Sequence, residues 1–116
     1  MKHSVIWTER KIKNIAKKHN ADTVYLCLKN ECDALAIMQD NLLVILPKSR
    51  VSPTDDAFNA KLNLIQDMRR VAEKFSSIKN NTLKHAYRFS TFARAAQFVS
   101  AKHNARTNDW KEIKIL

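Results

Sequence analysis

The sequence contains no glycine, although a chain of 116 residues with average composition would have roughly eight. Turns that need a positive backbone φ must therefore use asparagine or aspartate, which tolerate this conformation next best. A glycine-rich loop around a phosphate group is also excluded. This removes P-loop nucleotide hydrolases and dinucleotide-binding enzymes from consideration.

Cysteine is scarce as well. Cys27 and Cys32 are too few for a disulfide framework, and a bridge between them would close a very small loop. We therefore expect two thiols in a cytoplasmic protein. The cysteines and the four histidines lack the paired short spacings of a zinc site, so no structural metal is expected.

Long apolar runs are missing too. The longest run, residues 42–47, is about a third of the roughly 20 residues that a membrane span needs. Lys2 and His3 are not followed by the apolar stretch of a secretion signal. We expect no membrane among the partners of this chain.

Acidic residues are few: 11 face 21 lysines and arginines, which gives a formal charge of +10. Such an excess attracts polyanions. Because the cations are spread over several predicted elements, nucleic acid, and DNA first, is favoured over an anionic membrane or an acidic protein partner. A basic protein without an anionic ligand is the remaining alternative.

The first half of the chain predicts a helix and three strands. Thr8 is suited to cap a helix that starts at Glu9 and ends at Asn20. Strands are predicted over 23–28, 34–39 and 42–47, with a turn at Asp40 and Asn41, although a helix over 34–38 is an alternative. These strands are apolar on both faces, so we expect helices on both sides of the sheet.

The second half predicts two further helices. After a loop over 48–56, a helix over 57–75 is indicated by the spacing of Phe58, Leu62, Ile65, Met68, Val71, Ala72 and Phe75. Residues 82–89 fit a strand or a helix start, residues 91–103 a helix, and the tail from Trp110 an edge strand. The sequence thus predicts one α+β domain over 1–116, in the order α-β-β-β-α-(β)-α-(β).

Four residues in this order carry a resemblance. Glu9 lies on the first helix, Asp33 opens the second strand, Lys48 ends the third, and Gln66 lies in the next helix. Over roughly residues 8–75, this arrangement resembles the PD-(D/E)xK, or restriction-endonuclease-like, nuclease family, which includes the archaeal Holliday-junction resolvases. The resemblance implies catalytic roles for Glu9, Asp33 and Lys48, a Mg²⁺ ion bound by Asp33 and a possible homodimer.

The sequence departs from that family at one critical place. Leu46 stands two residues before Lys48, where the family has a metal-binding carboxylate, and leucine cannot bind a metal. We therefore expect a catalytically degenerate, nuclease-like domain that binds nucleic acid, and we expect DNA before RNA. An active Mg²⁺-dependent endonuclease, with Glu31 or Asp40 as a replacement ligand, is one alternative. A small interaction or inhibitor subunit is another, and Asp33, Asp40 and Lys48 also fit ordinary turn and strand-end roles.

Exposed cations are the expected contacts to phosphates, which position a nucleic acid without reading its bases. The predicted contacts are Lys11, Lys17, Lys18, Lys48, Arg50, Lys84, Arg88, Arg94 and Lys102. Tyr87 and Phe89 lie between these cations and could stack on bases, or belong to the core. His85 and Arg88 also match the His-x-x-Arg motif of tyrosine recombinases, but no tyrosine follows at a suitable distance.

Overall fold

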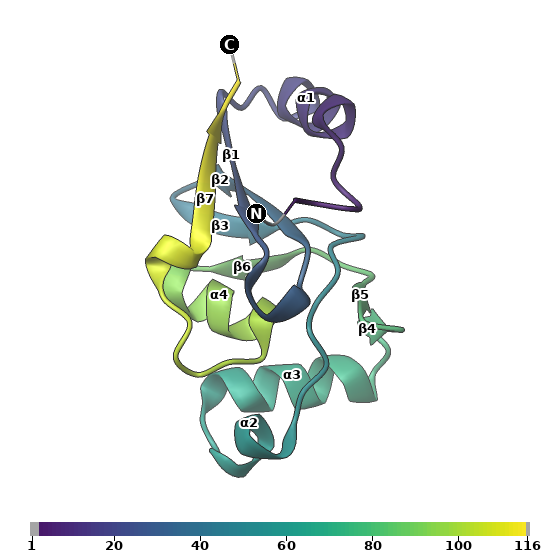
Figure 1. Cartoon of the computed structure of the whole chain (residues 1–116), viewed down its shortest axis with the longest axis vertical. Coiled ribbons are helices and arrows are strands. Elements are labelled where there is room, and N and C mark those ends of the chain that lie inside the picture. The colour runs from purple at the N-terminus through teal and green to yellow at the C-terminus, as the bar shows by residue number, and fades with distance from the viewer. Residues whose placement is uncertain (1–2, 116) are drawn as a thin grey trace.

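The computed structural model describes residues 3–115 and centres on a five-stranded antiparallel sheet in the order β6-β3-β2-β1-β7. Figure 1 shows α1 at one end of the molecule and α2 and α3 at the other. The helices are α1 (Glu9–Lys18), η1 (Lys29–Glu31), α2 (Asp56–Ala60), α3 (Leu64–Lys74), α4 (Phe92–Ser100) and η2 (Thr107–Asp109). The strands are β1 (Thr23–Cys27), β2 (Ala34–Gln39), β3 (Leu42–Ile45), β4 (Ile78–Lys79), β5 (Thr82–Leu83), β6 (Tyr87–Phe89) and β7 (Trp110–Lys114).

The predicted meander is confirmed. β1, β2 and β3 are consecutive antiparallel neighbours, with Leu26 opposite Leu35 and Ile37 opposite Val44. The turn between β2 and β3 has φ values of 54° at Asp40 and 65° at Asn41. Positive φ at both central residues gives the turn a twist that matches the twist of the strands. The alternative of a helix over 34–38 is wrong.

Two later segments complete the sheet at its edges. β7 pairs with β1, so the predicted strand from Trp110 is confirmed. The ambiguous segment 82–89 contains two short strands: β5 pairs with β4 in a separate hairpin, and β6 pairs with β3. The α+β class is therefore as predicted, with more small strands than the sequence indicated.

Helices cover both faces of the sheet, as its apolar strands predicted. On one face, Ile12 and Ala16 of α1 are buried in a cluster with Val24, Leu35 and other sheet residues. The hydroxyl of the predicted cap, Thr8, accepts a hydrogen bond from the amide of Lys11 at 3.3 Å. On the other face, a larger cluster joins the sheet to α3 and α4. The predicted helix over 91–103 is shorter at its C-terminal end, because α4 ends at Ser100.

The predicted single helix over 57–75 is wrong, because the chain breaks between α2 and α3. Asn63 has an extended backbone, and its side chain accepts a hydrogen bond from the amide of Gln66 at 2.9 Å. This cap starts a new helix and competes with continuation of the old one. As a result Leu62 is 85% exposed, and Val71 and Phe75 are exposed at 39% and 70%, although all three were predicted to face the core.

A buried arginine links the elements on the face of the sheet that α3 and α4 cover. Arg69 on α3 is fully buried and donates hydrogen bonds to the carbonyl oxygens of Phe98 at 2.7 Å and Ser52 at 2.6 Å. Burial lowers the pKa of Arg69, and the carboxylate of Glu73 opposes this change. Arg69 therefore fastens the connection after β3 to the end of α4, instead of adding to the surface charge.

Positive φ values occur where the absence of glycine predicted they would. Among residues 3–115, most of the residues with this conformation are asparagine or aspartate: Asn20, Asn30, Asp40, Asn41, Asn80 and Asn81. The others are Glu31, Lys48, Ser76 and Ala101. Within the same part of the chain, no helix has the length and apolar character that crossing a bilayer requires.

Candidate nucleic-acid interface

A small ladder of three neighbouring segments beside the main sheet brings several cations together. Residues 48–50 run antiparallel to β5: Lys48 N donates to Leu83 O at 2.9 Å, and Leu83 N donates to Ser49 O at 2.9 Å. Arg50 forms a bridge opposite Thr82. β5 is paired on its other side with β4, and Figure 1 shows this hairpin at the side of the molecule.

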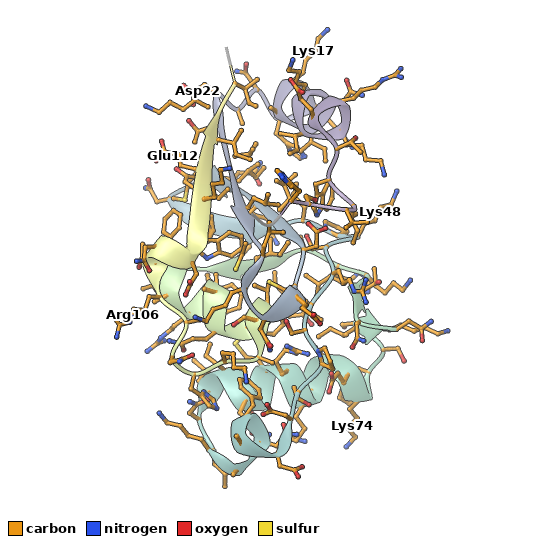
Figure 2. The ribbon with its side chains drawn as sticks, in the orientation of Figure 1. Lys17, Asp22, Lys48, Lys74, Arg106 and Glu112 are labelled. Carbon is orange, nitrogen blue, oxygen red and sulfur yellow. The ribbon has the colours of Figure 1, made fainter. Side chains whose placement is uncertain are left out.

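Alternation along these extended segments decides which side chains face outward. Ser49, Leu83 and Ile78 are buried against the core. Ser77 and Thr82, which flank them, are half-buried, and the other flanking residues are exposed. They include four cations, Lys48, Arg50, Lys79 and Lys84, which we call the basic ridge. Figure 2 shows Lys48 extending away from the ribbon.

The basic ridge retains its charge. Within residues 3–115, all the ion pairs involve cations outside the ridge, namely Lys13, Lys29, Arg69, Arg70 and Lys102. Arg50 also lines a hollow with two acids, the exposed Glu31 and the buried Asp33. Neither acid forms an ion pair with Arg50, so four neighbouring cations are available to a polyanion.

Lys48 has an unusual backbone for its residue type. Its φ of 73° lies in the left-handed region, which costs a residue with a Cβ about 1 kcal/mol or more. The hydrogen bond of its amide to Leu83 O holds the residue in place. Lys48 is exposed in this conformation at the start of the ridge.

The remaining predicted contacts lie elsewhere. Lys11, Lys17 and Lys18 are exposed on α1, and Figure 2 shows Lys17 at the end of the molecule far from Lys74. Arg88 on β6 lies opposite Val44, on the face of the sheet that α1 covers, and is exposed.

Two predicted contacts lie on the other side of the sheet. Arg94 is exposed on α4. Lys102 is half-buried, and its ammonium group is 3.3 Å from the carboxylate of Asp55. The amide of Phe58, and then Lys102, hold the pKa of Asp55 below its ordinary value. Lys102 is therefore paired with an acid, unlike the cations of the basic ridge.

The predicted aromatic contacts belong to the core. Phe89 is buried, and the ring of Tyr87 packs against Phe98 with centroids 4.8 Å apart. Sequence reasoning missed Lys79 in the basic ridge. The alternation Ser77-Ile78-Lys79 carried the signal, because it places Lys79 opposite to a buried isoleucine.

The predicted catalytic residues are not joined to one another. Glu9 is exposed on α1 and forms an ion pair with Lys13 at 3.1 Å. Asp33 is buried at the start of β2, and Lys48 belongs to the basic ridge. Within residues 3–115, none of Glu9, Asp33 and Lys48 donates a hydrogen bond to, or forms an ion pair with, another of the three.

The carboxylate of Asp33 accepts hydrogen bonds from residues Ser4–Ile6, which we call the N-terminal strap. The hydroxyl of Ser4 donates to one carboxylate oxygen at 2.7 Å, and the amides of Val5 and Ile6 donate to the other at 2.8 and 3.0 Å. Trp7 Nε1 donates to the backbone oxygen of Asp33 at 3.1 Å. These bonds explain why the strap lies across the start of β2.

This arrangement does not fit the Mg²⁺ ion that the resemblance implies. Both carboxylate oxygens of Asp33 already accept hydrogen bonds from the strap. In the part of the chain that the structure describes, no group of three or more histidines, cysteines, aspartates and glutamates is placed to hold a metal ion. Metal-dependent cleavage remains a prediction from sequence.

No family model, no curated protein and no solved structure matches the chain.

Proposed function

We propose that this protein binds the phosphate backbone of a nucleic acid, DNA in the first instance, through the basic ridge of Lys48, Arg50, Lys79 and Lys84. The observation that carries the proposal is the alignment of four exposed cations on adjacent segments of the chain, none of which forms an ion pair within residues 3–115. A formal charge of +10 supplies the long-range attraction for the same ligand.

The spacing of the ridge suits a linear polyanion. Lys48 and Arg50 are two residues apart, so their Cα atoms are separated by at most about 7 Å. The paired segment that carries Lys84 lies about 5 Å to the side. Long, flexible side chains can close these gaps to successive phosphates. Contacts of this type bind the backbone and carry no base specificity.

The chemistry of the ridge favours nucleic acid over an anionic membrane surface. A helix or patch that binds lipid places large apolar side chains beside its cations. Along the ladder itself, the residues between the cations are Ser77 and Thr82, which are half-buried and polar, and Asn80, which is exposed. Val5, which is 87% exposed, lines the hollow beside Arg50. An acidic protein surface is a different ligand, and the experiment below separates it from nucleic acid.

The proposal is tested by fluorescence anisotropy with labelled duplex, branched and single-stranded DNA over a series of salt concentrations. Each neutralised phosphate of duplex DNA contributes about −0.9 to the slope of log K against log salt. The double variant Lys48→Gln/Lys84→Gln should bind more weakly and lower the magnitude of the slope by about 1.8, because two such contacts are lost.

The chain provides a matched control on β7, at the opposite edge of the sheet from β6. Lys111 and Lys114 are exposed there and form no ion pair within residues 3–115. Lys111→Gln/Lys114→Gln removes the same charge and should change the slope by much less. Equal losses in both double variants, or affinity that ignores salt, would refute the ridge as the interface. Capture of an acidic protein from nuclease-treated host extract, without DNA affinity, would assign the ridge to a protein partner.

A further inference from the structure

Two buried cysteine thiols meet where β1 ends and η1 returns to the sheet. Cys27 is the last residue of β1, and Cys32 directly follows η1. Their sulfur atoms are 3.7 Å apart, and Cys32 Sγ is 3.3 Å from the carbonyl oxygen of Cys27. A disulfide has a sulfur–sulfur distance of about 2.0 Å. A small local movement is therefore enough to bring the sulfur atoms into bonding distance.

The connection between the two cysteines holds them in this position. Asn30 and Glu31 have φ values of 54° and 67°, which fold the chain back so that Cys32 approaches Cys27. The side chain of Asn30 donates to Ser100 O at 2.7 Å, and Ser52 Oγ donates to Asn30 O at 2.6 Å. The pair is therefore fixed by hydrogen bonds from three parts of the chain.

The surroundings favour a sulfur anion. A hydrogen bond from Cys32 lowers the pKa of Cys27; burial opposes this change, and the amide of Lys29 supports it. The guanidinium group of Arg69 interacts electrostatically with Cys32 from within the core. The thiolate is the form of a cysteine that reacts with oxidants.

One of the two cysteines borders a hollow, although it is only 2% exposed. Cys32 lines a hollow of about 380 Å³, together with His3, Glu31, Asp33 and Arg50. Cys27 lies behind it and is fully buried. Hydrogen peroxide is small enough to enter a hollow of this volume.

We infer that Cys27 and Cys32 form an oxidation site at which hydrogen peroxide generates a reversible intramolecular disulfide. The sulfur of one cysteine attacks one peroxide oxygen, so that an S–O bond forms, the O–O bond breaks and one water leaves. The sulfur of the other cysteine then attacks this sulfenic sulfur, forming the S–S bond and releasing a second water. Both thiols are oxidised, the peroxide is reduced, and the two thiol protons end in the water molecules.

This inference goes beyond nucleic-acid binding and does not depend on it. Two thiols, as the sequence predicts, are the reduced state of the site. A buried cysteine on its own behaves as a small apolar side chain. Here two cysteines are in contact, Cys32 lines a hollow, and Arg69 interacts electrostatically with Cys32. This combination distinguishes the pair from packing residues.

The test is intact-mass analysis of the whole chain after treatment with increasing hydrogen peroxide. The protein is quenched, unfolded and labelled with N-ethylmaleimide. Oxidised wild type should be lighter by two hydrogen atoms and take up no label, and a dithiol reductant should restore both labels. Each single variant, Cys27→Ala or Cys32→Ala, should instead stop at a sulfenic acid on the remaining cysteine that dimedone traps.

Three outcomes would overturn the inference. Wild type could keep two labelled thiols at peroxide concentrations that oxidise Cys27→Ala. It could instead form a disulfide between two chains, seen as a dimer on a non-reducing gel. Oxidation could also stop at a sulfinic acid without loss of two hydrogen atoms. The wild-type measurement decides these points even if a cysteine variant fails to fold, which circular dichroism would reveal.

Discussion

Removal of the Asp33 carboxylate should loosen the N-terminal strap and destabilise the protein. Asp33 accepts three hydrogen bonds from Ser4, Val5 and Ile6. Hydrogen bonds to a charged group contribute about 1.5–3 kcal/mol each when buried, and these are partly accessible to water, which replaces some of them. We therefore expect Asp33→Ala to lower the free energy of unfolding by about 3 kcal/mol.

The isosteric change Asp33→Asn should cost much less, about 1 kcal/mol. The amide oxygen of asparagine can accept from the amides of Val5 and Ile6, and its nitrogen can donate to Ser4 Oγ. Asp33→Asn should therefore destabilise the protein less than Asp33→Ala, because asparagine can keep hydrogen bonds that alanine cannot form.

Thermal and urea unfolding, followed by circular dichroism, measure both changes. For 116 residues the entropy of unfolding is about 0.24 kcal/mol/K, so 3 kcal/mol corresponds to a fall of about 12 °C in Tm. Hydrogen exchange should become faster at Val5 and Ile6. Glu112→Ala is the control, because Glu112 is an exposed carboxylate on β7, and it should change stability by less than about 0.5 kcal/mol. If Asp33→Ala matches this control, the structural role assigned to Asp33 is refuted.

Two further predictions concern α3 and the break between α2 and α3. Arg69→Met should lower stability by about 3 kcal/mol, because it leaves the carbonyl oxygens of Phe98 and Ser52 buried without their donors; urea unfolding at an unchanged m-value would show this, and a change under 1 kcal/mol would contradict it. Leu62→Gln should change stability by less than about 0.5 kcal/mol, whereas Ile65→Ala should cost about 2–4 kcal/mol, since Leu62 is exposed and Ile65 is 4% exposed. Comparable losses at both positions would mean that the helix continues through Leu62.

Local signals in the sequence were sufficient for the meander and the first helix. The two-residue turn at Asp40 and Asn41 fixes the pairing of β2 with β3, because residues that tolerate positive φ are required there and the flanking strands are apolar. The cap at Thr8 likewise depends on its immediate neighbours. Such features are encoded within a few residues, so they can be predicted without knowledge of the fold.

The break between α2 and α3 was not predictable in the same way. The apolar period through Leu62, Val71 and Phe75 favoured one long helix, but the cap at Asn63 and the packing of Ile65 against the core outweighed it. A period records which residues can share a face. It does not record whether another element covers that face.

The sequence by itself determined the α+β class, the surplus of cations and the need for asparagine and aspartate in turns, because composition and short-range pattern settle these properties. Tertiary structure alone decided which charges act together. It buried Arg69, paired Lys102 with Asp55, and aligned Lys48 with Lys84 across 36 residues of sequence by antiparallel pairing of residues 48–50 with β5. Contacts between distant segments depend on the whole chain being folded, so no local pattern contains them.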